Sequence, residues 1–394
     1  LVVMIVNINK DSRIKESTYK TANGESVSTF LAEYIREGIT IGGVEGTLKV
    51  LDTSDATASA KDIEWGRTAY VNGEKITGTM LTSNKVSYLK GKDVYFDENK
   101  EVIDDLENKI ILPKGFKISE ESAVLVEDGI VIEDRNKNQF VWIPAGINGV
   151  NINTTTGIKN VKYERIDFGI QFGGKPTWDE NANYGYYESM PEDERSSIEK
   201  YYGYYIGRFD AGDKEVTNEK RMRNENDSIN NTVTIKKGDA PYNYVLKKDA
   251  VSLSEGMAQE EGYDTKTKLC SSFAWDTAIN FIQIKTSDYG TNSPQGNYKD
   301  TTFNYANIGE TEKMQTKTNG STILVPNGQT TPVSNIYDMS GNMFKFISEI
   351  YHMDGDTWEP VYRGGNSQAL VDDRPVGYRA YRDRDNIKDE FWRF

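Results

Sequence analysis

The stretch Asn335-Ile-Tyr-Asp-Met-Ser-Gly-Asn-Met-Phe-Lys-Phe346 carries the clearest fold signal in the chain. The tripeptide Ser340-Gly-Asn342 at its centre is suited to a tight turn. Apolar residues on both sides of the turn have enough bulk to seat it in a hydrophobic core: Ile336, Tyr337, Met339, Met343, Phe344 and Phe346. A short loop fixed in this way holds its carbonyls and side chains in set directions. The stretch therefore indicates either a ligand or cation site or a structural corner.

Composition narrows the classes of protein that the chain can belong to. Its 394 residues suffice for two or three domains, and 27% charged against 37% hydrophobic residues indicates globular domains with long polar loops. The net charge of −14 argues against nucleic acid as a partner. No apolar run approaches the roughly 18 residues of a membrane span. A single cysteine excludes an internal disulfide, and a single histidine argues against a histidine-based metal site or a Ser-His-Asp triad.

Residues 1–38 are predicted as an attachment or oligomerisation segment. Leu1-Val-Val-Met-Ile-Val6 alternates onward into Asn7-Ile8-Asn9 as a strand does, and it is too short for a signal peptide. Apolar residues at 27, 30, 31, 34 and 35 follow helical spacing, which predicts a helix between Ser26 and Gly38. So short an element cannot bury its own apolar stripe, and we expect it to dock on a neighbour.

An internal repeat follows. Val44-Glu-Gly-Thr-Leu48 and Ile76-Thr-Gly-Thr-Met80 match at an offset of 32, and Asn72-Gly73 predicts a two-residue hairpin turn. The stretch from Gly66 to Met80, with Ser59-Ala-Lys-Asp-Ile63 before it, resembles a repeat of tail and fibre proteins of phages and prophages. The resemblance covers about residues 39–80, within a predicted repeat domain of residues 39–82, and implies a structural virion protein.

The rest of the chain divides into a linker and a larger domain. Residues 83–108 are predicted as a linker with a strand or two, and residues 109–394 show short strands between turns. Ser272-Phe-Ala-Trp-Asp-Thr-Ala-Ile-Asn-Phe-Ile282 is the clearest helix, with Ser271 or Ser272 as its cap. Residues 210–262 and 284–334 read as long polar loops, which in compact domains are usually functional or mobile.

Five segments of the larger domain occur in the order seen in one family: Phe140-Val-Trp-Ile-Pro-Ala-Gly146, Tyr205-Ile-Gly-Arg-Phe209, Phe273-Ala-Trp-Asp-Thr-Ala278, Asn335-Ile-Tyr-Asp-Met-Ser-Gly-Asn342 and Tyr362-Arg-Gly-Gly-Asn366. Together they resemble the C-type-lectin-like domain of the formylglycine-generating-enzyme family, although Phe391-Trp-Arg-Phe394 departs from its closing Gly-Phe-Arg. The resemblance implies an α+β fold with short strands, few helices and long loops, and it is silent on activity.

The residues that carry the family's chemistry are missing. Its enzymes oxidise a substrate cysteine with copper held by two cysteines, and this chain has Cys270 alone. A family calcium site, carried over by position, would use Asp338 and the carbonyls of Gly341 and Met343, with Lys345 in place of a glutamate ligand. We therefore predict no catalytic residue and no cofactor, and a lost calcium site whose cation is replaced by the Lys345 ammonium. In this prediction Asp338, Gly341, Asn342 and Lys345 form a structural turn.

The C-terminal stretch is the predicted ligand-binding face. Aromatic, amide and charged side chains at strand ends can stack on sugar rings and bind their hydroxyls, and non-enzymatic members of the family bind ligands here. The alternative is an Arg–Asp surface that pairs with itself and contributes little to stability. The predicted ligand-binding residues are Trp358, Tyr362, Arg363, Asn366, Tyr378, Arg379, Tyr381, Arg382, Asp383 and Asn386.

These patterns together predict a phage, prophage or tail-like-particle protein. It would act as a receptor-binding adhesin located on the virion, with no nucleic-acid partner and no membrane insertion. Fibre-type repeats need partners to bury their faces, which favours a homotrimer joined to other tail or baseplate proteins through the N-terminal region. Two alternatives stay open. One is a baseplate, neck or capsid decoration protein without a ligand, and the other is a formylglycine-generating-type oxidase.

Overall fold

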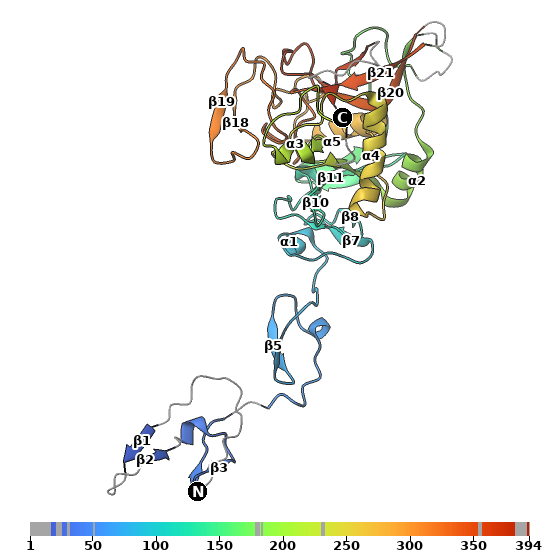
Figure 1. The fold of residues 1–394 in the computed structure, drawn as a ribbon. Helices are drawn as coiled ribbons and strands as arrows, with labels where there is room; N and C mark the ends of the chain where they lie inside the picture. The colour runs from blue at the N-terminus through green and yellow to red at the C-terminus, as the bar shows by residue number, and fades with distance from the viewer. Residues whose placement is uncertain are drawn as a thin grey trace. The chain divides into compact units, whose positions relative to one another are not determined.

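The structure is a computed structural model of the chain (Figure 1). It describes residues 17–20, 26–29, 32–49, 52–177, 182, 184–229, 233–353, 357–382 and 392–393, with backbone alone for 17–20, 26–29 and 392–393. The chain forms two compact units, Leu1–Thr82 and Ser83–Phe394. The predicted residues Asp383 and Asn386 lie outside the described parts.

The first unit begins with a β-hairpin of β1 (Ser17–Lys20) and β2 (Ser26–Thr29), which pair antiparallel. The helix predicted between Ser26 and Gly38 is therefore wrong for its first turn. Among the described residues of this span, the helical part is one 3₁₀ turn, η1 (Ala32–Tyr34). The β-branched residues Val27 and Thr29 favour the extended backbone that the hairpin uses.

The same unit holds two copies of one small module. The first copy joins η1 to the hairpin β3 (Thr40–Ile41) and β4 (Val44–Glu45). The second joins η2 (Ala60–Asp62) to β5 (Thr68–Val71) and β6 (Glu74–Thr77). In the first copy Thr47 and Leu48 donate backbone hydrogen bonds to Ala32 and Ile35. In the second, Thr79 and Met80 donate to Ala60 and Ile63.

A glycine marks the crossing point of each module. An added Cβ would lie 2.2 Å from the Arg36 carbonyl oxygen at Gly46 and 2.3 Å from that of Glu64 at Gly78. The glycine of each Gly-Thr pair is thus required for the chain to pass against the one-turn helix. The predicted hairpin at Asn72-Gly73 is confirmed, with both residues at positive φ.

Neither module buries a hydrophobic core of its own. In the described part of this unit, Ile35 is the one buried large apolar side chain. Six large apolar side chains of the unit are at least one-third exposed: Tyr34, Ile39, Ile41, Leu48, Tyr70 and Met80. The repeat places two of them, Leu48 and Met80, at the same position of each copy. Exposed apolar side chains thus recur at matching positions of the two modules.

The second unit starts at Ser83, so residues 83–108, predicted as a linker, pack within it. They form α1 (Val86–Leu89) and the hairpin of β7 (Lys100–Ile103) with β8 (Lys109–Leu112). Asp104 closes the hairpin loop by accepting from the Asn108 amide at 2.8 Å. Asp134 accepts from the Asn138 amide at 2.7 Å in the loop of a second hairpin.

That second hairpin belongs to a four-stranded antiparallel sheet in the order β15-β11-β10-β9. Its strands are β9 (Lys117–Ile118), β10 (Val131–Glu133), β11 (Gln139–Pro144) and β15 (Gly203–Gly207), with η3 (Val126–Asp128) before β10. The strand β15 is one edge of this sheet. The polar loops of the unit carry three small hairpins: β12 (Val150–Thr154) with β13 (Gly157–Val161), β16 (Gly212–Asp213) with β17 (Val233–Thr234), and β18 (Phe303–Ala306) with β19 (Met314–Lys317).

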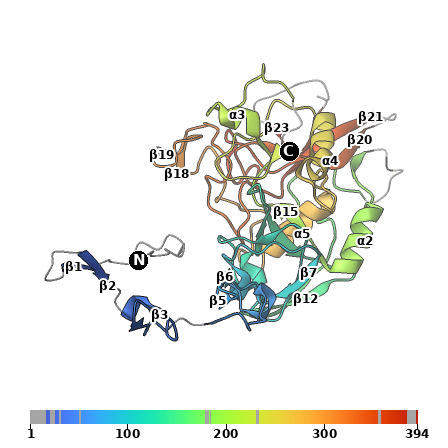
Figure 2. The same cartoon turned by 60° about the horizontal axis from the view of Figure 1, so that its bottom comes forward.

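The C-terminal strands form a second sheet in the order β14-β20-β21-β22. They are β14 (Gly185–Tyr187), β20 (Phe344–Met353), β21 (Thr357–Arg363) and β22 (Arg379–Tyr381), and β23 (Trp392–Arg393) pairs with β20. Helix α4 (Lys247–Glu261) lies beside β20 in both ribbon views (Figures 1 and 2). The remaining helices are α2 (Glu192–Tyr201), α3 (Lys214–Asn218) and α5 (Ser272–Ile282).

Helix α5 occupies the bounds predicted from the sequence. Ser271 caps it by accepting from the Ala274 amide at 3.0 Å, and most of its side chains are buried. The described residues form five α-helices among many short strands and long loops, which confirms the α+β class. No helix in these described ranges is long and apolar enough to cross a membrane.

Candidate functional site

The predicted binding face is split by the structure into a buried half and an exposed half. Arg363 and Arg379 are at most 1% exposed, and Tyr362 and Asn366 are also buried. Tyr378 is half-buried against the core packed on α4. The prediction that Arg363 and Arg379 lie on a ligand-binding surface therefore needs correction. Their positions in β21 and β22 point toward α5, because side chains alternate along a strand.

These two arginines belong to an internal ion cluster. Arg379 bridges two carboxylates, donating from Nε to Glu349 Oε2 and from Nη2 to Asp276 Oδ2, both at 2.8 Å. Arg363 Nη2 donates to Asp276 Oδ1 at 2.6 Å, and Arg165 pairs with Glu349. All five side chains are buried. Burial alone would raise the pKa of Glu349, but Arg379 and Arg165 lower it below its ordinary value.

The ion cluster joins separate elements of the second unit. Asp276 comes from α5, Glu349 from β20, Arg363 from β21 and Arg379 from β22. Arg363 also donates from Nε to the Tyr378 carbonyl at 3.2 Å. Because every charge has a close opposite partner inside the protein, the cluster fixes the helix against the sheet. Removing one partner would leave an uncompensated buried charge.

Aromatic side chains gather further along the same sheet, and we call this group the aromatic end: Phe172, Tyr351, His352, Trp358 and Tyr381. Tyr351 is buried, His352 and Tyr381 are half-buried, and Phe172 and Trp358 are exposed. The Tyr351 and Tyr381 rings stack in parallel with centroids 3.6 Å apart, and Phe172 lies 5.6 Å from Tyr381. On the opposite face of the sheet, Trp358 stacks on His352 at 4.1 Å. Phe172 is 57% exposed and Trp358 is 42% exposed.

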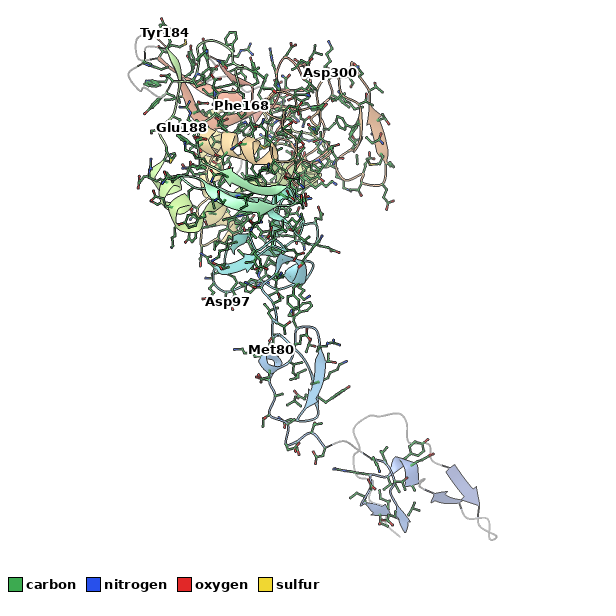
Figure 3. The ribbon with its side chains drawn as sticks, turned by 180° about the vertical axis from the view of Figure 1, so that it is seen from behind. Met80, Asp97, Phe168, Tyr184, Glu188 and Asp300 are labelled. Carbon is green, nitrogen blue, oxygen red and sulfur yellow. The ribbon has the colours of Figure 1, made fainter. Side chains whose placement is uncertain are left out.

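Neighbouring polar groups hold these rings in place. The Gly174 amide donates to the Tyr351 hydroxyl at 3.3 Å, and the His352 Nδ1 lies 2.6 Å from the Ala182 carbonyl oxygen. Burial and the neighbouring Tyr351 raise the pKa of Tyr381, so its hydroxyl stays protonated at neutral pH. Arg382, at the end of β22, is exposed, and Figure 3 shows Tyr184 at the outer edge of this unit. Such a set of fixed rings with hydroxyl and guanidinium groups can stack on a sugar or an aromatic side chain.

The turn at residues 338–342 is a structural hub. Asp338, Gly341 and Asn342 all have positive φ, which explains glycine and asparagine at two of these positions. Buried Asn342 accepts from the Val325 amide at 3.0 Å and donates to the Val325 carbonyl at 2.9 Å. An added Cβ at Gly341 would lie 2.6 Å from the Asn297 carbonyl oxygen. The turn thus ties the long loop before it to the C-terminal sheet.

Lys345 places a cation at this turn. Its side chain is 2% exposed, and its ammonium donates to the Gly341 carbonyl at 2.6 Å. That carbonyl is one of the oxygens that the family resemblance assigns to calcium. Asp338 accepts from the Gly328 amide at 2.8 Å through Oδ2. The Lys345 ammonium thus binds one of the oxygens named in that resemblance, and its replacement of a calcium ion stays a prediction.

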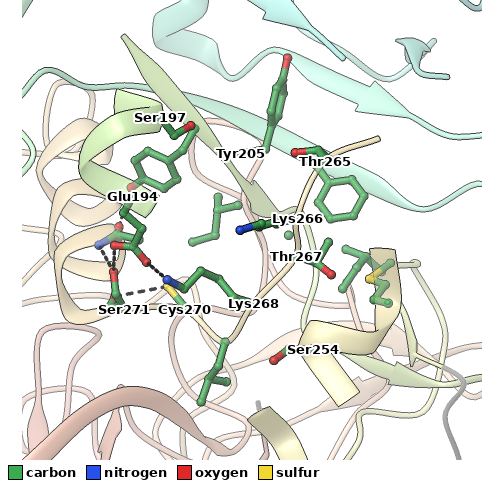
Figure 4. A pocket seen from close by; sticks show the side chains of 18 of the residues that line it. Glu194, Ser197, Tyr205, Ser254, Thr265, Lys266, Thr267, Lys268, Cys270 and Ser271 are labelled. Carbon is green, nitrogen blue, oxygen red and sulfur yellow. Dashed lines mark hydrogen bonds and ion pairs between the residues drawn. The ribbon is translucent and has the colours of Figure 1, made fainter. Parts of the chain in front are cut away.

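Cys270 lines a cavity of about 720 Å³ within the second unit, which no sequence pattern indicated (Figure 4). At one end of the cavity, Glu194 accepts from Tyr163 at 2.6 Å and from Ser271 at 2.8 Å, and Lys268 lies 3.0 Å from its other oxygen. Burial and the nearby Glu194 raise the pKa of the Cys270 thiol well above its ordinary value. Without a bound metal ion, the thiol therefore stays protonated at neutral pH.

Comparisons with known proteins add little. No family model and no curated protein matches the chain. Among solved structures it is similar to PvdO from Pseudomonas aeruginosa, at 12% identity and a TM-score of 0.36, over 67% of this chain and 95% of that one. It is also similar to CarF, at 16% identity and a TM-score of 0.28, over 39% of this chain and 65% of CarF. Both scores are too low to carry an argument about fold or function.

Proposed function

We propose that the chain is a structural virion protein of a phage, prophage or phage-tail-like particle. In this proposal it is a non-enzymatic, receptor-binding adhesin without a cofactor. A C-type-lectin-like domain of the formylglycine-generating-enzyme type, built from the second unit, binds a glycan or protein on the host surface. The first unit connects homotrimers of the chain to other tail or baseplate proteins.

The observation that carries the proposal is the repeated module of the first unit. Two copies share the same backbone hydrogen bonds and the same Gly-Thr crossing, and both expose an apolar residue directly after it, Leu48 or Met80. Serial modules without cores of their own are typical of proteins whose copies pack alongside one another. This arrangement suits a fibre better than a free enzyme.

The aromatic end supports the adhesin over the alternatives. The exposed ring of Phe172 packs on half-buried Tyr381, and that of Trp358 stacks on half-buried His352. Rings held in this way are pre-organised for binding, because less side-chain entropy remains to be lost. The buried ion cluster, by contrast, removes Arg363 and Arg379 from any contact surface. A decoration protein without a ligand remains the second candidate, since half of the predicted face is internal. The oxidase candidate is weakened by the presence of one cysteine, Cys270, where the family's enzymes hold copper with two.

Competition for host attachment tests the proposal. Purified full-length chain, added in excess, should block adsorption of the particles that carry it to their host cells. Its molar mass in solution should be three times that of one chain. A trimer that does not reduce adsorption would support the decoration protein instead. A monomer that shows copper-dependent oxidation of a cysteine peptide would favour the enzyme.

A further inference from the structure

The cavity described above is lined in part by charged side chains that balance one another. The lining carries four carboxylates and three ammonium groups: Asp193, Glu194, Asp210, Asp264, Lys266, Lys268 and Lys345. Lys268 lies 3.1 Å from Asp193 and 3.0 Å from Glu194. Lys114, which is not part of the lining, adds a fourth ammonium 2.7 Å from Asp264. Because positive and negative groups are equal in number, the cavity favours a polar ligand without net charge.

Aromatic rings form another part of the wall. The ring centroid of Tyr263 lies 4.9 Å from that of Phe116 and 6.3 Å from that of Phe140. Trp142 and Tyr205 form a second ring pair at 5.1 Å. The indole N–H of Trp142 is buried and has no hydrogen-bond partner within the described residues, so an acceptor brought to this wall would satisfy it. Flat ring faces of this kind pack on the C–H face of a sugar ring.

The edge of β15 adds main-chain donors and acceptors to the cavity, which all five residues of this strand line. The Arg208 amide donates to the Gln139 carbonyl, and this bond sets the alternation of hydrogen bonds between β15 and β11. The N–H and C=O groups of Gly203, Tyr205 and Gly207 therefore point away from β11. Among the described parts of the chain, these groups make no backbone hydrogen bond on that side.

The cavity is covered by an extended segment, residues 264–269, which we call the strap. Over the described residues, the strap makes no backbone–backbone hydrogen bond. Side chains hold it instead, because Thr267 accepts from the Ala258 amide at 2.9 Å and Lys268 pairs with the two carboxylates of α2. Segments with few backbone hydrogen bonds open at a low cost in free energy. The strap can therefore move aside for a ligand while both sheets stay folded.

We propose that the cavity is a binding site for an uncharged saccharide that carries N-acetyl groups. The sugar rings stack on the aromatic wall, and their hydroxyls both donate and accept hydrogen bonds, as the mixed polar lining requires. An acetamide group, like a peptide group, pairs with the outward N–H and C=O groups of β15. The volume of about 720 Å³ lies in the range of small-molecule sites. No residue of the aromatic end lines the cavity, so the two sites are separate.

Two disaccharides test the site directly. N,N′-diacetylchitobiose and cellobiose share the same glycosidic linkage and differ in an acetamide or a hydroxyl beside the anomeric carbon of each ring. Calorimetric titration of the full-length chain should show saturable binding of diacetylchitobiose and at least tenfold weaker binding of cellobiose. Bound diacetylchitobiose should slow hydrogen exchange of the outward Tyr205 amide. The Ile206 amide, which faces β11, is the internal control and should not change.

Substitution of Tyr263 gives a second readout. Tyr263→Leu removes a ring from the wall, whereas Tyr263→Phe keeps the ring and loses the hydroxyl that donates to Asp134 at 2.6 Å. Diacetylchitobiose should bind at least tenfold more weakly to Tyr263→Leu, and Tyr263→Phe should recover the affinity of the natural chain.

Three results would overturn the saccharide site: no binding of diacetylchitobiose, equal binding of cellobiose, or binding without slower exchange at Tyr205. Each of them leaves the adhesin proposal standing, because adsorption competition measures attachment to host cells and the aromatic end is separate from the cavity. A failure of adsorption competition would likewise leave saccharide binding in the cavity unaffected.

Discussion

Arg363 and Trp358 lie five residues apart on β21 and have opposite surroundings. Arg363 is fully buried and pairs with Asp276, whereas Trp358 is 42% exposed and stacks on His352. The difference follows from the two faces of the strand, because residues an odd number of positions apart point to opposite sides of a sheet. Arg363 faces Asp276 of α5, and Trp358 lies on the other face, beside His352. Residue type alone therefore does not separate a supporting side chain from a contacting one.

The ion cluster should give the largest effect when it is broken. Asp276→Asn keeps the shape of the side chain but leaves Arg363 and Arg379 facing each other with less opposite charge. We expect the free energy of unfolding of the second unit to fall by about 3–5 kcal/mol in urea titration. The exposed Asp372→Asn should change it by less than about 0.5 kcal/mol. Equal values for the two variants would mean that the cluster does not stabilise the sheet.

Disrupting a small module of the first unit should give the next largest loss of stability. Gly78→Ala would place a Cβ 2.3 Å from the Ile63 carbonyl oxygen, so the module must open, at a cost of about 3 kcal/mol. Hydrogen exchange of the Thr79 and Met80 amides should become fast. Gly66 has a positive φ but open space around it, so Gly66→Ala should cost only about 1 kcal/mol of strain. If the Thr79 and Met80 amides of Gly78→Ala still exchanged slowly, this would contradict the conclusion that the two modules share a crossing that needs glycine.

The Lys345 substitution tests whether an ammonium stands in for calcium. Lys345→Glu removes the internal cation and adds the carboxylate that the family pattern expects. At a calcium concentration 100 times the dissociation constant, we predict that the free energy of unfolding of this variant rises by about 2.7 kcal/mol. Thermal unfolding measures the change. The natural chain and Lys345→Met should not respond to calcium or to a chelator. A calcium-dependent shift in the natural chain would refute the replacement.

Acid should remove part of the cluster's contribution. The arginines lower the pKa of Glu349 below its ordinary value of 4.5, so its carboxylate stabilises the folded state at neutral pH. That stability is lost as the pH falls through the lowered pKa, because both states are then protonated. The advantage of the natural chain over Glu349→Gln in urea titration should therefore be full at pH 7 and decline below about pH 4.5. A difference that is constant with pH would exclude Glu349 as the titrating partner.

The sequence predicted local structure better than the role of charged residues. Asn72-Gly73 and the helix capped by Ser271 follow from short-range chemistry, and both are confirmed. The prediction that Arg363 lies on a ligand-binding surface was wrong, because its position in the strand, and not its residue type, turns the side chain inward. One signal was available: Asp276 is the lone charge within the apolar helix Ser272–Ile282, which is typical of a buried ion pair.

Other features could not be predicted from residue patterns. The cavity between β15 and residues 265–271 depends on how the two segments pack. No residue spacing in the sequence encodes the distance between them. The matching loops closed by Asp104 and Asp134 became visible only through their hydrogen bonds. The helix predicted between Ser26 and Gly38 failed because an apolar stripe of that length also fits a hairpin.

Ligand binding by the aromatic end is the most direct test of the adhesin proposal. The full-length chain and its Phe172→Ala and Trp358→Ala variants would be compared on a glycan array and in adsorption competition. Ile158→Ala, at an exposed apolar residue of β13, is the matched control. We predict that each aromatic substitution weakens binding by about tenfold, or about 1.4 kcal/mol, while the control and the folded stability are unchanged. Full binding by both aromatic variants would contradict the account.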